Sequence, residues 1–314
     1  MNQPKISIYV PAYNCETTIT KCLDSLLAQT YPQVEIVVVN DGSTDKTGEI
    51  LANYATSCRV ITQANQGLGK TRRNAIAVCT GEYVATVDAD DYVTPNWLTD
   101  CITAMTENNA DVGMFGFVSV DQEGHELKYG LKREYQAELL SSVETVQRLG
   151  KDELKNMSWG FITKREYWLQ VLEHLTASRY YEDVASTYKV MMQANRVALI
   201  PGTYYYYVQA EGTITKTPSI NQVTDLERIK QQLQADLTGP YQPLLTDWIF
   251  HITMMQYQIL SLIGGHGTQL KQLKQDILAN IPAGMSKAER IKVLLVRMNL
   301  YSHFYGSIKK LRNI

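Results

Sequence analysis

Residues 34–45 read VEIVVVNDGSTD, and this stretch decides the fold class. Its first six residues are nearly all apolar and β-branched, which is typical of a parallel strand buried on both faces. Asp41 to Asp45 are turn formers that also favour the start of a helix. The stretch therefore predicts a strand, a turn and a helix in succession, the repeating unit of a parallel α/β sheet.

The same succession continues on both sides of this stretch. Further strands are predicted over residues 6–10, 59–62 and 83–87, and helices over about 19–30, 69–79 and 95–108, the last opened by Thr94-Pro95. This order predicts a mostly parallel sheet with helices on both faces.

Polar segments follow three of these strands. In parallel α/β sheets ligands bind beyond the carboxyl ends of the strands, so these segments mark the expected site. They are Pro11-Ala12-Tyr13-Asn14, Asn40-Asp41-Gly42-Ser43 and Asp88-Ala89-Asp90-Asp91.

The pattern changes twice along the chain. It is mixed from about residue 111 to residue 220, and from residue 221 onward the apolar spacing is helical throughout. We therefore expect residues 1–220 to form one domain, with halves 1–110 and 111–220, and residues 221–314 to form an all-helical C-terminal region.

The charge is unevenly distributed. The net charge is -2, which excludes a strongly basic nucleic-acid binder, and we expect no nucleic-acid partner. Residues 271–314 carry nine Lys or Arg against two acids, a net +7, which leaves -9 for residues 1–270. Two interpretations stay open for the basic segment: a solvated helix packed on its neighbours, or a helix lying on an anionic membrane surface.

The cysteines and the apolar stretches indicate a cytoplasmic protein. All five cysteines lie in the first third of the chain without CxxC spacing, which favours reduced thiols over disulfides or a metal site. The N-terminus lacks the apolar core of a signal peptide, and the most apolar stretch, residues 248–263, is interrupted by polar residues.

Two acidic segments each allow two interpretations. Asp88 to Asp91 could place carboxylates on a divalent cation, or it could be an acidic loop capping the next helix. Glu182-Asp183 could hold a general base between apolar neighbours, or it could be a solvated pair at a helix start. For Asp41 alone, a turn role is favoured over contact with a nucleobase.

A rival motif lies at Ala64 to Thr71, ANQGLGKT, which is similar to a P-loop. Val84 to Asp88 then imitates the acidic strand of an NTPase. Ala64 stands where a P-loop has glycine, and the preceding strand is short and polar, so a P-loop NTPase is the second hypothesis. A non-catalytic scaffold that docks a partner through its helical tail is the third.

Taken together, the ordered motifs resemble a bacterial family 2 glycosyltransferase of the GT-A fold. The motifs are SIYVPAYN (residues 7–14), VVNDGSTD (38–45), GEY (81–83), DADD (88–91), Trp159, Glu182-Asp183, Tyr206-Tyr207 and Thr213-Ile214. They extend over about the first 215 residues, and their order along the chain makes the combination specific.

The resemblance implies a nucleotide-sugar donor, most commonly a UDP-sugar. It implies that residues 1–110 form the nucleotide-binding half and residues 111–220 the acceptor half. Its implied donor-site residues are Pro11, Ala12 and Tyr13 at the base and ribose, Asp41 accepting from a base N–H, Arg72 at the diphosphate, and Asp88 at the ribose and donor sugar.

The resemblance further implies an inverting, metal-dependent transfer of a hexose or an N-acetylhexosamine. Asp90 would ligate Mn²⁺ or Mg²⁺ and Asp183 would be the catalytic base. The acceptor would be a glycan or a lipid-linked hydroxyl in the synthesis of a surface polysaccharide or a related glycan. The basic C-terminal helix could then meet the inner face of the cell membrane, and homo-oligomerisation is left open.

Overall fold

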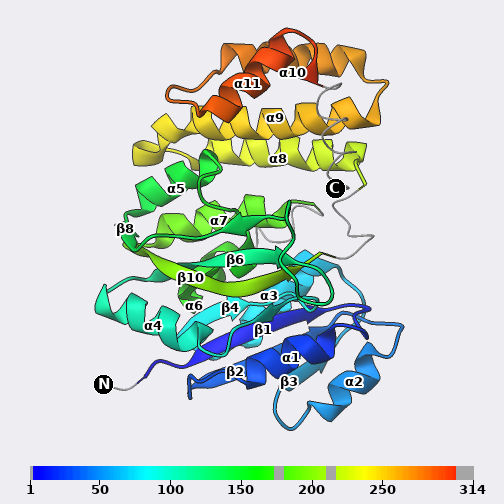
Figure 1. Cartoon of the computed structure of the whole chain (residues 1–314), viewed down its shortest axis with the longest axis vertical. Coiled ribbons are helices and arrows are strands. Elements are labelled where there is room, and N and C mark those ends of the chain that lie inside the picture. The colour runs from blue at the N-terminus through cyan, green and yellow to red at the C-terminus, as the bar shows by residue number, and fades with distance from the viewer. Residues whose placement is uncertain (1–2, 173–179, 210–216, 302–314) are drawn as a thin grey trace. The chain divides into compact units, whose positions relative to one another are not determined.

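The computed structural model describes residues 3–172, 180–209 and 217–301 (Figure 1). The chain divides into two compact units. The first comprises residues 1–145 and 155–211, and the second comprises residues 146–154 and 212–314. These units differ from the predicted domains, because the segment 146–154 groups with the C-terminal residues. The domain boundary at residue 220 therefore stays a prediction.

The first unit is built on one ten-stranded sheet. Four neighbouring strands are all parallel, in the order β3 (Arg59–Thr62), β2 (Val34–Asn40), β1 (Ile6–Ala12) and β4 (Tyr83–Thr86). In Figure 1 they are the blue and cyan arrows. Their order confirms the parallel sheet predicted from residues 34–45.

The sheet continues with strands that make it mixed. Next to β4 lie β9 (Phe161–Lys164), β6 (Val112–Val120), β10 (Val197–Val208) and β5 (Tyr92–Val93), and β7 (Lys132–Arg133) and β8 (Glu138–Leu140) pair with β6 and β10. β9 is antiparallel to both of its neighbours, whereas β6 and β10 are parallel to each other. β10 therefore brings together β6, β8 and β5 in the half of the sheet beyond β4.

Helices cover both faces of the sheet, as predicted. One buried core joins alternate residues of β1 to α1 (Ile19–Leu27), α2 (Thr47–Asn53) and α4 (Trp97–Glu107). α3 (Leu68–Val78) packs on β1 and β2 without joining that core, so it covers the opposite face.

Helix α4 begins later than Thr94-Pro95 predicts. Its N-cap is Asn96, because the N–H of Thr94 donates to the carbonyl of Tyr204 (2.9 Å) and so extends the pairing of β5 with β10. Three further α-helices lie between β8 and β10 in the sequence: α5 (Ser142–Gly150), α6 (Arg165–Val171) and α7 (Glu182–Gln193).

The second unit is helical, as predicted. Its main helices are α8 (Ile220–Asp236), α9 (Leu245–Ile263), α10 (Gly267–Ala279) and α11 (Lys287–Arg297). α9 packs against α8 and α10, and α11 packs against α10. The indole of Trp248 donates to the carbonyl of Val146 (3.0 Å), which ties residues 146–154 to these helices. Among the described residues, no helix combines the length and the apolarity needed to cross a membrane.

Candidate active site

The polar loops that follow β1 and β2 are joined by hydrogen bonds. The N–H of Asp41 donates to the carbonyl of Ala12 (2.8 Å), and the N–H of Asn14 donates to the hydroxyl of Ser43 (3.0 Å). In return, the amide oxygen of Asn14 accepts the N–H of Thr44 (2.8 Å). Two of the three predicted polar segments therefore form one surface at the carboxyl ends of the strands.

Asp41 is a buried anchor of a third loop. Its Oδ1 accepts from the side chain of Gln63 (2.7 Å) and from the N–H of Gln66 (2.9 Å), and its Oδ2 accepts from the N–H of Gly67 (2.8 Å). Gly42 has φ 71°, and a Cβ there would lie 2.7 Å from the backbone nitrogen of Asn65. The turn after β2 therefore closes tightly on residues 63–67, a contact that the turn formers at 41–45 do not predict.

This arrangement removes the support for a P-loop at Ala64 to Thr71. A P-loop binds phosphate through its backbone N–H groups. In this structure the carboxylate of Asp41 already holds the N–H groups of Gln66 and Gly67. The loop is thus the support of the Asp41 turn rather than an open phosphate cradle.

The three residues predicted at the base and ribose differ in their exposure. Pro11 and Ala12 are buried in β1, and Ala12 belongs to the core. The side chain of Tyr13 is 51% exposed. Among these three, Tyr13 is therefore the one whose side chain can meet a ligand, whereas Pro11 and Ala12 shape the surface through their backbone.

The acids that follow β4 point to different partners. Asp88 Oδ1 lies 3.0 Å from Arg72 Nη2, and the side chain of Asp90 is exposed. Asp91 is buried and accepts from the hydroxyl of Tyr205 (2.6 Å) and from the N–H of Val208 (2.8 Å). Burial, then the charges of Asp90 and Asp88, raise the pKa of Asp91 well above its usual value. Asp91 is thus a structural acid, which leaves Asp88 and Asp90 facing the site.

Tyr205 holds the turn that carries these acids. Besides donating to Asp91, its hydroxyl accepts the N–H of Asp88 (3.2 Å). The ring of Trp159 stacks on the ring of Tyr205, with centroids 4.2 Å apart and planes 10° apart. Four consecutive tyrosines in a strand predict two rings in the core, and Tyr204 and Tyr205 are the buried ones; the contact of the Tyr205 hydroxyl with the acids after β4 was not predicted.

Arg72 is buried and bridges two acids. Its Nη2 contacts Asp88 Oδ1 and its Nη1 contacts Glu182 Oε1 (2.7 Å). Its Nε has no hydrogen-bond partner among the described residues. The guanidinium therefore joins the end of β4 to the start of α7, and the predicted contact with a diphosphate stays a prediction.

The two acids at the start of α7 have different surroundings. Glu182 is paired with Arg72, whereas Asp183 Oδ1 accepts the N–H of Val184 (2.8 Å). Burial and the charge of Glu182 raise the pKa of Asp183 to about 7. The hydrogen bond from Val184 and the charge of Arg72 lower this pKa, but by less. The structure thus brings the predicted base into one charged cluster with Arg72 and Asp88.

Asp90 is the acid that best suits a cation. Although the side chain of Asp90 reaches solvent, desolvation by the protein around its carboxyl, and then the charge of Asp88, raise the pKa of that carboxyl, and no cationic side chain of the described residues is paired with it. Carboxylate oxygens are the ligands that Mg²⁺ and Mn²⁺ prefer. Another group of candidate ligands in the described part of the chain is Asp121, Glu123 and His125, where Asp121 is already paired with the ring of His125 (3.2 Å).

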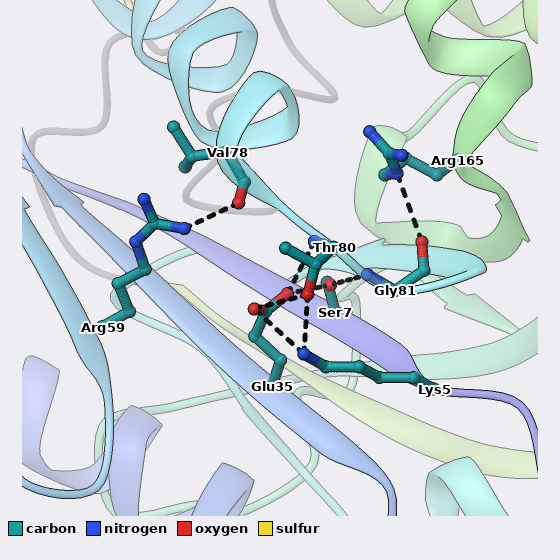
Figure 2. Close-up of polar contacts among 8 residues, drawn as sticks. All are labelled: Lys5, Ser7, Glu35, Arg59, Val78, Thr80, Gly81 and Arg165. Carbon is teal, nitrogen blue, oxygen red and sulfur yellow. Dashed lines mark hydrogen bonds and ion pairs between the residues drawn. The ribbon is translucent and has the colours of Figure 1, made fainter.

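A hollow of about 640 Å³ lies at the other end of the strands. It is lined by Gln3, Pro4, Lys5, Gln33, Thr80, Gly81, Glu82 and Arg165. Figure 2 shows the network at its edge: the carboxylate of Glu35 accepts from Ser7, from Lys5 Nζ (3.2 Å) and from both the N–H and the hydroxyl of Thr80 (2.8 Å each). Most of these residues precede β1, β2 or β4, and Arg165 follows the antiparallel β9, so the hollow is not at the ligand edge of the sheet.

Comparisons with known proteins agree with this arrangement. The family model "Glycosyl transferase family 2" matches residues 7–169. "Glycosyltransferase GlyG" of Streptococcus pneumoniae is 31% identical over 223 residues, which cover 68% of this chain and 73% of that protein. "Uncharacterized glycosyltransferase EpsJ" of Bacillus subtilis is 30% identical and covers 74% of this chain and 69% of its own.

A solved structure extends the likeness of the fold to nearly the whole chain. S. aureus TarS 1-349 in complex with UDP-GlcNAc aligns with a TM-score of 0.71 at 23% identity, over 98% of this chain and 92% of that one. The aligned part of this chain includes helices α8–α11. The chain belongs to glycosyl transferase family 2 and is a glycosyltransferase of the GT-A type.

Proposed function

We propose that the protein transfers a sugar from a nucleotide-sugar to an acceptor hydroxyl, with inversion at the anomeric carbon. The observation that carries the proposal is the difference between the two acids at the start of α7. Glu182 is held by Arg72, whereas Asp183 has a pKa raised to about 7 by burial and by Glu182. A carboxyl with a pKa near the working pH is suited to take a proton from an attacking hydroxyl.

In this reaction Asp183 is the general base. The acceptor hydroxyl gives its proton to the carboxylate of Asp183 while its oxygen bonds to the anomeric carbon. The bond from that carbon to the diphosphate oxygen breaks on the opposite side, and its electron pair leaves with the nucleoside diphosphate. A base placed in this way contributes about 10²–10⁴-fold to the rate.

The donor is proposed to bind across the loops that follow β1, β2 and β4. The exposed ring of Tyr13 offers a stacking surface for a base, beside the turn that Asp41 anchors. Asp88 is proposed to contact the ribose and the donor sugar, and Arg72 the diphosphate. The complex of TarS, a neighbour in fold, with UDP-GlcNAc makes UDP-sugars the first donors to test.

A divalent cation is proposed at Asp90, with Asp88 beside it. Desolvation, and then the charge of Asp88, raise the pKa of Asp90, and a bound cation would offset both effects. Bound there with the donor, Mn²⁺ or Mg²⁺ would neutralise the charge of the departing diphosphate. Asp91 would not take part, because both of its oxygens are bound to β10.

The acceptor is proposed to be a hydroxyl of a glycan or of a lipid-linked glycan, in the synthesis of a surface polysaccharide or a related glycan. The motif resemblance, which continues through Trp159 and Tyr206-Tyr207 into residues 111–220, supports an acceptor half in that region. Whether the sugar is a hexose or an N-acetylhexosamine follows from the donor screen below.

The test is a screen of UDP-, GDP- and dTDP-sugars with Mn²⁺ or Mg²⁺, reading the release of nucleoside diphosphate, with EDTA as the metal-free control. Asp183→Asn is expected to lose at least about 10²-fold in transfer rate and to bind the donor nucleotide as the original protein does. Asp100→Asn, which changes an acid on α4, serves as the matched control. Equal loss of transfer and of nucleotide binding in Asp183→Asn would contradict the role given to this residue.

A further inference from the structure

Helix α11 carries apolar side chains on two opposite sides. Val293 and Val296 are buried, at 5% and 0% exposure. Ile291, Leu294 and Met298 are 58%, 51% and 55% exposed. At about 100° per residue, the three exposed side chains lie within one narrow sector nearly opposite the buried ones. We call these three residues the outer stripe.

The outer stripe is flanked by cations. Lys287, Arg290, Lys292 and Arg297 are all exposed on the same helix. Its one acid, Glu289, is held in a capping box at the helix start, where its N–H donates to Ser286 Oγ and its Oε2 accepts the N–H of Ser286 (2.7 Å). The surface around the outer stripe is therefore apolar at its centre and positive at its margins.

We propose that the outer stripe of α11 docks on an anionic lipid surface. Helices with apolar side chains on one side and Lys or Arg beside them lie in the interface of a membrane, where the apolar side chains enter the acyl boundary and the cations meet lipid headgroups. An anionic lipid surface would therefore contact both the apolar outer stripe and the cations beside it. The inference does not depend on the proposed reaction.

Charge disfavours two other occupants. A second copy of the chain docking through the same face would bring one positive surface onto another. The last residues of the chain, 302–314, contain Lys309, Lys310 and Arg312 and no acid, so their charge also has the wrong sign. A nucleic acid would use the cations but not Ile291, Leu294 and Met298.

The first test is sedimentation of the full chain with vesicles of phosphatidylglycerol and phosphatidylcholine, compared with vesicles of phosphatidylcholine alone. We expect binding to the anionic vesicles. The triple variant Ile291→Ser, Leu294→Ser and Met298→Ser is expected to bind at least about tenfold more weakly, with an unchanged melting temperature. Arg290→Gln with Lys292→Gln is expected to lower binding about fivefold for each charge removed.

The matched control changes three exposed apolar side chains of the first unit to Ser. Leu27, Leu131 and Leu139 are 44%, 47% and 44% exposed in the first unit, and their triple change to Ser is expected to leave vesicle binding unchanged. Equal binding by the outer-stripe variant and the original protein would overturn the proposal, and so would equal weakening by the control.

A second test distinguishes an anionic lipid surface from the last residues of the chain itself and from a second copy of the chain. Leu294→Cys is labelled with a polarity-sensitive fluorophore, with the original protein labelled in parallel as the background. We expect a blue shift when anionic vesicles are added to dilute protein. A blue shift already present without vesicles would assign the face to the chain itself, and one that grows with protein concentration would assign it to a second copy. Either result would overturn the proposal.

Discussion

The hydroxyl of Tyr205 lies 2.6 Å from Oδ2 of Asp91, although 114 residues separate the two. The same hydroxyl accepts the N–H of Asp88, and Asp91 Oδ1 accepts the N–H of Val208. Strand β10 therefore sets the geometry of the turn that presents Asp88 and Asp90. Tyr205 is a positioning residue, since its hydroxyl acts on the turn and is fully buried.

Tyr205→Phe is expected to weaken the binding of Mn²⁺ with donor nucleotide by about tenfold. The turn loses both hydrogen bonds of the Tyr205 hydroxyl. One of them is the buried donor of Asp91, and leaving a buried acceptor unpaired costs about 1–3 kcal/mol. Stacking on Trp159 is retained. Calorimetry gives the binding constant and steady-state kinetics give KM and kcat, with KM rising more than kcat falls.

Tyr204→Phe is the control for that change. Its hydroxyl donates to the carbonyl of Pro201 (3.0 Å) on the same strand, away from the acidic turn. It is expected to cost similar stability and to leave metal and nucleotide affinity unchanged. An equal effect of both variants on affinity would show that the role of Tyr205 is only structural.

The pH dependence of kcat/KM is expected to report Asp183. A base must be deprotonated, and burial and Glu182 raise the pKa of Asp183 to about 7, so the rate should rise with pH and reach half its plateau near pH 7. Glu182→Gln removes one cause of that raised pKa and leaves Arg72 to lower it further. The rise should then move to lower pH, and a profile that stays in place or moves upward would count against Asp183.

Asp41→Asn is expected to loosen the loop at residues 63–67. The amide keeps one acceptor oxygen and loses the other, so either Gln66 or Gly67 loses its acceptor. Hydrogen exchange at these two amides should accelerate, and the free energy of unfolding should fall by about 1–3 kcal/mol. Asp24→Asn, which changes an acid on α1, is the comparison, and unchanged exchange at Gln66 and Gly67 would refute the anchoring role.

Glu35 is expected to contribute stability that acid removes. Burial alone would raise the pKa of Glu35, but hydrogen bonds from Ser7, Thr80 and Lys5 outweigh it and lower the pKa to about 2 (Figure 2). A carboxyl with a depressed folded pKa stabilises above its unfolded value of 4.5, and this contribution is lost as the pH falls toward 2.

Glu35→Gln should therefore lower the free energy of unfolding by about 1–3 kcal/mol near neutral pH. The difference from the original protein should shrink between pH 4.5 and pH 2, as measured by urea unfolding at each pH. Glu107→Gln, at an exposed position on α4, should change little. A constant difference across that range would mean that the carboxylate of Glu35 is not the source.

The parallel half of the fold could be predicted because its signals are local. The β-branched run of residues 34–39 and the turn formers after it lie within a dozen residues, and β1, β2 and β4 appear where they were expected. β9 and β5 were missed, since such short strands depend on partners distant in the sequence: β9 lies between β4 and β6, and β5 lies at the end of the sheet beside β10. Residue types alone predicted the acids, but not how Asp88, Asp90 and Asp91 divide their roles, because Arg72 and Tyr205 decide this from other elements.

The long separation between Asp91 and Tyr205 also fixes when the site can form during synthesis. A nascent chain that has emerged only through α4 already holds Asp88, Asp90 and the four parallel strands, but it lacks the hydroxyl that shapes their turn. The same is true of a fragment cut at residue 169, where the family match ends. Asp88 and Asp90 are therefore synthesised well before the strand that shapes their turn, which gains its hydrogen bonds to Tyr205 and Val208 only after residue 208 has joined the sheet.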